Sequence, residues 1–123
     1  MAESILQKGD CCYICGRTGP ERLDKHHIFG GANRNLSEKY GLTVKLCHCS
    51  CHIFGQYSVH TNAAVNHFLQ AKAQRRAMKV YGWTEDDFRK IFGKSYLDIT
   101  EDEREKVNGL KTYIMMQKEA AYV

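Results

Sequence analysis

Residues 12–16 read CYICG and residues 46–52 read LCHCSCH, and the predicted architecture depends on these two stretches. In the first stretch two cysteines are separated by two residues and are followed by Gly16, which tolerates the backbone of a tight turn. The second stretch supplies a further pair of cysteines. Two such pairs are typical of a tetrahedral site of four thiolates, so we predict a structural zinc ion held by Cys12, Cys15, Cys47 and Cys51.

Two of the six cysteines, Cys11 and Cys49, fall outside this set. The run Cys47, Cys49, Cys51 leaves the choice among its three members open. Six unliganded buried thiols would not explain the spacing, and in a reducing compartment clustered cysteines are metal ligands more often than disulfides.

The composition is that of one compact globular protein. The chain has 123 residues, of which 43% are hydrophobic and 26% are charged, with a single proline and a formal charge of +4. Its first residues contain no apolar stretch of signal-peptide length, and no window approaches the length of a membrane-spanning helix. We therefore expect a cytoplasmic protein that does not enter a membrane.

Residues 1–60 hold every cysteine and five of the six histidines, which indicates a loop-rich module stabilised by metal. Apolar residues at Leu23, Ile28, Val44 and Leu46 lie in short stretches that we expect to pair as two strands, with residues 30–33 as a loop between them. The predicted fold class is α+β, a small zinc-stabilised core followed by helices.

Three helices are predicted after residue 60. The first starts at Thr61 or Asn62, runs for about 18 residues and stops at Gly82. A shorter helix lies between Thr84, which starts a capping-box pattern, and Gly93. A third opens at Thr100 and is interrupted at Gly109. It carries Val107, Leu110 and Ile114, and it ends in Met115, Met116 and Tyr122.

Histidines lie between and after the two cysteine pairs. Residues 23–31 read LDKHHIFGG, His52 directly follows Cys51, and His60 follows Val59. The order C-x2-C, then HHI with a glycine-rich loop, then L-C-x3-C-H resembles the HNH endonucleases, whose ββα-metal core is often held by a zinc knuckle of the treble-clef type. The resemblance covers roughly residues 11–70 and rests on several parts in the right order.

The resemblance implies a role for each histidine. His26 is expected to be a ligand of a catalytic divalent ion (Mg²⁺, Mn²⁺, Ni²⁺ or Zn²⁺), His52 a second ligand, and His27 the general base. Phosphodiester hydrolysis needs a base that deprotonates water and a cation that stabilises the phosphate and the departing alkoxide, and histidine suits both tasks.

The chain departs from the family pattern in two places. One helical turn after His52 the sequence has Gln56, so we assign the next histidine, His60, as the third ligand, placed by a short insertion that contains Gly55. The central asparagine of the pattern is also missing from its usual place. Four asparagines are candidates to replace it: Asn33, Asn35, Asn62 and Asn66.

Three other residues have less specific interpretations. Asp24 shares the strand face of His26, so it is either a hydrogen-bond partner of that ring or a solvated carboxylate. We interpret His48 and His67 as surface or packing residues.

The predicted partner is DNA, bound chiefly through its phosphates. On the first helix a basic stripe continues the apolar face with the spacing of one helical side, namely Lys72, Arg75, Arg76 and Lys79. This stripe is either a solvated face or a phosphate-contacting surface beside the histidines.

We expect a nuclease-like domain over residues 1–97, and a C-terminal helical extension over residues 98–123 that is a candidate for pairing two copies. The predicted function is a metal-dependent DNA endonuclease of the HNH type, leaving a 5′-phosphate and a 3′-hydroxyl. The alternative is a non-catalytic zinc module that binds nucleic acid or a protein, in which His26, His27, His52 and His60 complete a second, closed structural site.

Overall fold

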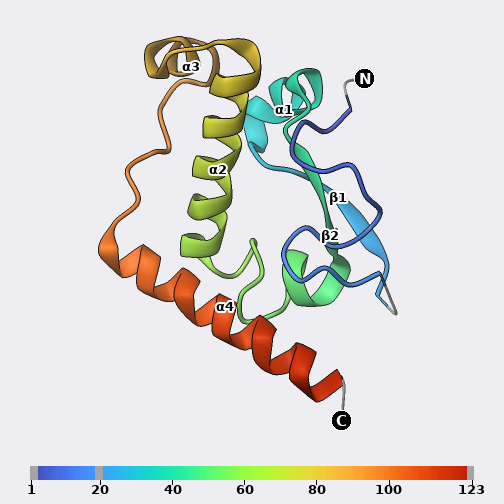
Figure 1. Ribbon diagram of the computed structural model, residues 1–123. Coiled ribbons are helices and arrows are strands. Elements are labelled where there is room, and N and C mark those ends of the chain that lie inside the picture. Colours follow the sequence, from blue (N-terminus) through green and yellow to red (C-terminus); the bar gives the residue numbers. More distant parts are fainter. Residues whose placement is uncertain (1–2, 19–20, 122–123) are drawn as a thin grey trace.

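The computed structural model describes residues 3–18 and 21–121, and from residue 112 it describes the backbone alone. It shows a small α+β protein in which an antiparallel hairpin of two strands is followed by helices (Figure 1). The predicted fold class is confirmed.

Strands β1 (Leu23–His27) and β2 (Thr43–Cys47) form the hairpin. The register places Leu23 opposite Cys47 and His26 opposite Val44. Because Val44 is 2% exposed and Leu46 is fully buried, the hairpin is anchored in the core through β2. The predicted pairing of these two stretches is thus confirmed.

The connection between the strands is more ordered than the predicted loop. A 3₁₀ turn at Gly31–Asn33 leads into helix α1 (Arg34–Tyr40), which ends at Gly41 in the left-handed conformation. The helix has only seven residues and no side-chain cap, so its sequence lacks the periodicity by which a helix is recognised. Its position is held instead by Ser37, which is fully buried and bonds both backbone groups of Phe29.

Helix α2 (Ala63–Tyr81) follows the hairpin after a π-helical turn over His48–Ile53. The Asn62 side chain accepts hydrogen bonds from the amides of Ala64 and Val65, and Gly82 ends the helix as predicted. The β1–β2–α2 order matches the expected ββα arrangement (Figure 1).

Helix α3 (Glu85–Phe92) completes the core on the side of α2 away from the π-helical turn (Figure 1). It starts with a capping box between Thr84 and Asp87, as predicted. The ring of Phe29, two residues after the end of β1, lies 4.9 Å from that of Phe92 and 5.0 Å from that of Tyr96. Burial of these rings ties α3 to the hairpin.

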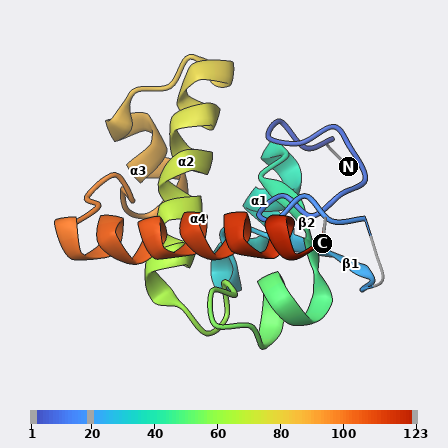
Figure 2. The ribbon, with the colours of Figure 1, turned by 60° about the horizontal axis from the view of Figure 1, so that its bottom comes forward.

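Helix α4 (Glu101–Ala121) crosses α2, as Figure 2 shows. Val107 and Leu110 are buried, and they line one groove with Val65 and Phe68 of α2. Two residues expected to pair copies therefore pack within one chain. The side chains of Ile114, Met115 and Met116, and all of Tyr122, lie outside the described residues, and pairing stays a prediction.

The predicted interruption of this helix at Gly109 is wrong, because the helix continues through that residue. A Cβ atom there would lie 2.9 Å from the hydroxyl oxygen of Tyr57. Glycine is required at this position by the close approach of Tyr57 and does not end the helix.

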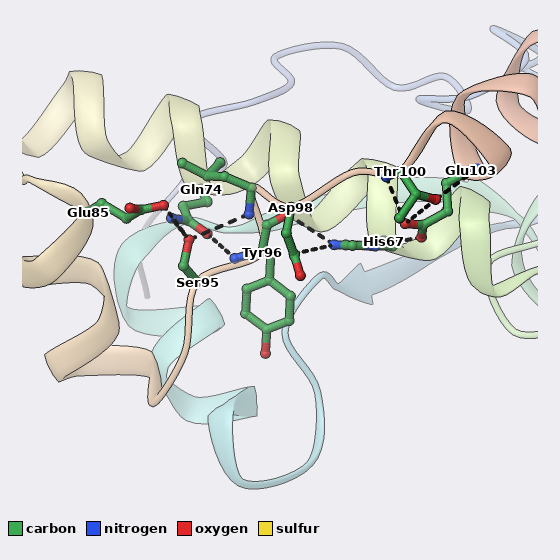
Figure 3. Close-up of polar contacts among 9 residues, drawn as sticks. His67, Gln74, Glu85, Ser95, Tyr96, Asp98, Thr100 and Glu103 are labelled. Carbon is green, nitrogen blue, oxygen red and sulfur yellow. Dashed lines mark hydrogen bonds and ion pairs between the residues drawn. The ribbon is translucent and has the colours of Figure 1, made fainter.

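The segment between α3 and α4 is fixed by two polar side chains of α2 (Figure 3). Gln74, fully buried, accepts a hydrogen bond from the amide of Tyr96 and donates one to Ser95. One ring nitrogen of His67 lies 2.5 Å from Glu103, and the other lies 3.0 Å from the carbonyl oxygen of Tyr96. His67 is a packing residue, as expected.

None of the helices in the described part of the chain is both long and apolar enough to span a bilayer.

Candidate metal centres

Four cysteines converge between the N-terminal knuckle and the end of the hairpin. The sulfur atoms of Cys12, Cys15, Cys47 and Cys51 all lie within 4.8 Å of one another, and those of Cys15 and Cys47 are 3.8 Å apart. A tetrahedral zinc ion with Zn–S bonds of about 2.3 Å requires S–S separations of about 3.8 Å. The four thiols therefore fit a structural zinc ion, and they are the set predicted.

The backbone explains why these four cysteines meet. The carbonyl of Cys12 accepts a hydrogen bond from the amide of Gly16, which closes the knuckle turn, and the amide of Tyr13 donates to Lys45 of β2. Cys47 is the last residue of β2, and the π-helical turn brings Cys51 back beside it. The knuckle is thus bonded to the strand that ends at Cys47, the first cysteine of the second pair.

The two remaining cysteines lie outside this cluster. Cys49 is exposed, and Cys11 is half-buried with its carbonyl bonded to Gln7. This settles the choice that the C-x-C-x-C run leaves open, because Cys47 and Cys51 point to one centre and the residue midway between them does not.

The pKa values of these cysteines also favour a bound cation. Hydrogen bonds from Cys15 and Cys51 hold the pKa of Cys12 well below its ordinary value. Hydrogen bonding with Cys12 raises the pKa of Cys51, and burial raises that of Cys47 to about 12. Ionisation of Cys47 and Cys51 is therefore opposed in the protein alone, and a divalent cation would stabilise their thiolates.

Three histidines form a second cluster, separate from the cysteines. His26 comes from β1, His52 from the π-helical turn and His60 from the loop before α2, and one nitrogen of each lies within 4.8 Å of the others. The Nε2 atoms of His52 and His60 are 3.2 Å apart. Ligands about 2.0–2.1 Å from one tetrahedral ion would be about 3.3 Å apart, so the spacing fits a shared metal.

His26 gives the strongest indication that this cluster is suited to a metal ion. The residue is 8% exposed, and its Nε2 atom is buried without a hydrogen-bond partner in the described part of the chain. Burial, with the neighbouring His52 and His60, lowers the pKa of His26 to about 3, so the ring is neutral at pH 7. A neutral imidazole whose buried nitrogen has no hydrogen bond is suited to bind a metal ion.

The insertion before α2 explains why His60 lies beside His52. The amides of Phe54 and Gly55 both donate to the carbonyl of Cys49, and the amide of His60 donates to that of His52. A Cβ atom at Gly55 would lie 1.9 Å from the carbonyl oxygen of Ser50, so only glycine allows this close return. The loop folds back along the π-helical turn and brings His60 to His52.

Asp24 is a hydrogen-bond partner of the cluster, but of a different histidine from the one expected. Its Oδ2 atom accepts from Nδ1 of His52 at 2.9 Å and from Nδ1 of His48 at 2.5 Å, and no bond joins it to His26 in the part of the chain described. Burial opposes ionisation of Asp24, but the two histidine hydrogen bonds outweigh it and lower its pKa to about 2.

The carboxylate of Asp24 therefore fixes the His52 tautomer with Nε2 free toward the cluster. His48 was missed as a member of this network, although it lies four residues before His52, a spacing that places two side chains on one helical face. Asp24, His48 and His52 also lie close enough together to form a further group of possible metal ligands.

An open cleft borders the histidine cluster. His26, His27, His52 and His60 line it together with Lys25 and Arg34, and α2 contributes Asn66 and Gln70. Of the four asparagines that are candidates for the missing one, Asn66 alone is among these lining residues. Asn62 caps α2, and the side chain of Asn33 donates to the carbonyl of Phe92.

The predicted basic stripe lies on another side of α2. Lys72, Arg75, Arg76 and Lys79 are exposed, and none lines the cleft. The Lys72 ammonium lies 4.8 Å from the ring centroid of Tyr13, and Arg76 donates to the carbonyl of Ile5. Contact of this stripe with DNA stays a prediction, and the charges beside the histidines are Lys25 and Arg34.

No protein-family model matches the chain. A search of curated proteins and a search of solved structures also found no match. The function is therefore inferred from the two clusters of possible metal ligands and from the cleft.

Proposed function

We propose that the protein is a metal-dependent DNA endonuclease of the HNH type. One observation carries the proposal: three histidines spaced for a single ion lie in the wall of an open cleft, with a fourth histidine beside them. This cleft is separate from the four-cysteine centre, so the chain has one centre suited to structure and one suited to chemistry.

The number of ligands supports a catalytic role for the histidine cluster. Structural zinc sites are closed by four protein ligands, whereas catalytic sites keep a position open for water or substrate. The cysteine centre has four ligands, and the histidine group contains three among the described residues. A closed second structural site, the rival interpretation, would need His27 as a fourth ligand.

His27 has a different environment from the three proposed ligands. It follows His26 in an extended strand, so the two rings leave opposite faces of β1. Its Nε2 atom lies 2.7 Å from a carboxylate oxygen of Glu38. An unliganded imidazole that lines the same cleft is suited to take a proton from the attacking water.

The remaining groups of the cleft suit a phosphodiester. Lys25 and Arg34 are cations that would bind the phosphate oxygens, and Asn66 and Gln70 add amides. When bound, a divalent ion held by His26, His52 and His60 would stabilise the negative charge on the phosphate and on the departing oxygen. No base-reading motif is present, so we propose binding through the DNA backbone.

Nicking of supercoiled plasmid tests this proposal. Purified protein is incubated with the plasmid in Mg²⁺, Mn²⁺, Ni²⁺ or EDTA, beside His27→Ala and a Gln56→Ala control from the loop that carries His60. We expect nicking that needs the divalent ion, that falls at least about 100-fold in His27→Ala and that persists in Gln56→Ala. Absence of nicking with every ion, or equal nicking by His27→Ala with unchanged zinc content, would favour the non-catalytic zinc module.

A further inference from the structure

We propose that Glu38 is a positioning residue that holds the His27 ring in one tautomer, with Nε2 protonated and Nδ1 open to accept a proton from water. This inference rests on the proposed nuclease function and adds a residue to it. No sequence motif points to Glu38, because it lies on the helix inserted between the two strands.

The contact is short and sheltered. Oε2 of Glu38 lies 2.7 Å from Nε2 of His27, and the two side chains are 25% and 15% exposed. The other carboxylate oxygen lies 2.6 Å from Nζ of Lys25. Lys25 and His27 are two residues apart in β1 and so share a face of the strand. One carboxylate with a partner on each oxygen has a fixed orientation across this face.

The helix that carries Glu38 is itself fixed against the hairpin. Ser37, the preceding residue, accepts from the amide of Phe29 at 3.0 Å and donates to its carbonyl at 2.7 Å. The carbonyl of Ser37 also accepts from the amide of Leu42. Because these bonds join α1 to both ends of the strand connection, the distance from Glu38 to His27 does not depend on a flexible loop.

The protonation of the pair follows from the charges around it. A hydrogen bond from Lys25, with a second from His27, lowers the pKa of Glu38, so its carboxylate is ionised at pH 7. An ionised carboxylate only accepts hydrogen bonds, and therefore Nε2 of His27 must carry the hydrogen between them. The lone pair of the neutral ring is then on Nδ1.

The proton transfer balances without any further reactant. Water gives one proton to Nδ1 of His27 as its oxygen bonds to phosphorus, the phosphorus–oxygen bond to the leaving group breaks, and solvent protonates the alkoxide. His27 then returns its proton to solvent. Glu38 stays ionised throughout, and it stabilises the imidazolium that forms, as an orienting carboxylate does in other histidine-dependent enzymes.

Glu38→Gln tests the inference, with Glu101→Gln as the control that removes the same charge from the exposed start of α4. We expect kcat for plasmid nicking to fall at least about 10-fold in Glu38→Gln, with KM changed less than about two-fold, because an amide does not fix the tautomer. In a His27→Ala background the same change should cost no more than about two-fold, since Glu38 acts through His27.

A second measurement does not depend on activity or on a catalytic ion. Imidazole ¹⁵N chemical shifts of the zinc-loaded protein should show His27 protonated at Nε2, and Glu38→Gln should shift that tautomer while Glu101→Gln leaves it unchanged. A wild-type His27 protonated at Nδ1, or an equal loss of nicking from Glu38→Gln with and without His27, would overturn the inference. Absence of nicking in the wild type with the expected tautomer would instead overturn the nuclease proposal alone.

Discussion

Adjacent residues of this protein belong to different clusters of possible metal ligands. Cys51 and His52 are neighbours in the π-helical turn, yet the first belongs to the cysteine centre and the second to the histidine cluster. The two centres are therefore joined by one peptide bond. The structural ion proposed for the cysteines would hold the turn that presents His52, and Asp24 would orient its ring.

The distinction between Cys47 and Cys49 gives a first prediction. Cys47→Ser removes a ligand from a site worth about 10–16 kcal/mol in small zinc modules, so it should release zinc and abolish the cooperative unfolding transition. Cys49→Ser, an exposed position, should change the free energy of unfolding by less than about 0.5 kcal/mol. Zinc content and urea denaturation measure both; equal zinc loss in the two variants would contradict the ligand set.

The buried ring of His26 gives a pH dependence of stability. Its pKa of about 3 in the folded chain lies below the ordinary value for histidine, so the unfolded chain binds a proton that the folded chain does not. The stability from the neutral ring is therefore complete above about pH 6.5 and is lost as the pH falls through the range between the two pKa values.

With zinc in the cysteine centre and no ion on the histidines, the free energy of unfolding should fall between pH 7 and 5.5. We expect this fall to be about 1 kcal/mol larger in wild type than in His26→Gln. Urea denaturation at the two pH values measures the difference. Identical pH slopes for the two proteins would show that His26 titrates normally in the folded chain.

Helices and strands differed in how well they could be predicted. The ends of α2 and α3 follow from local signals, namely the Asn62 cap, the capping box at Thr84 and the glycines that stop each helix. Helix α1 was missed because its stability comes from Ser37 bonded to Phe29, a contact that local sequence does not encode. The role of Gly109 was predicted wrongly because the side chain that requires glycine there, Tyr57, is distant in the sequence.

The residues of the candidate site also differ in whether the sequence alone could predict them. The grouping of the four cysteines was predicted from their spacing, whereas that of His26 and His52 was implied by the resemblance and His60 was added as the next histidine in the sequence. The partners of those ligands were not predicted, since Asp24 had to be placed beside His52 by the strand and the π-helical turn together. The positive charge of Arg34 in the cleft was also not predicted, because the position of α1 brings this residue there.

The loop that positions His60 supplies a prediction about an element. Gly55→Ala places a methyl group against the carbonyl of Ser50, so we expect a loss of about 1–3 kcal/mol in the free energy of unfolding and weaker Mn²⁺ binding. Gly9→Ala is the control, because no described atom lies within 4 Å of a Cβ at that position. Denaturation and Mn²⁺ titration measure the effects, and Mn²⁺ affinity equal to that of the control would contradict the proposed placement of His60.

On the scale of the whole molecule, the four-cysteine cluster is separate from the cleft that the three clustered histidines line. The formal charge of +4 is modest, but Lys25 and Arg34 lie in the cleft itself. The basic stripe on α2 faces another direction, so a bound duplex that reached both surfaces would have to pass around α2. Salt dependence of binding in variants of each surface would show which one contacts phosphate.

The most direct test of the account is a crystal soaked in Mn²⁺, with anomalous diffraction measured at the manganese and zinc edges. We predict a zinc peak among the four cysteine sulfurs and a separate manganese peak bound by His26, His52 and His60, with no fourth protein ligand and with His27 bonded to Glu38. A histidine site that binds no ion, or one that His27 closes as a fourth ligand, would contradict the assignment of this cleft as a catalytic centre.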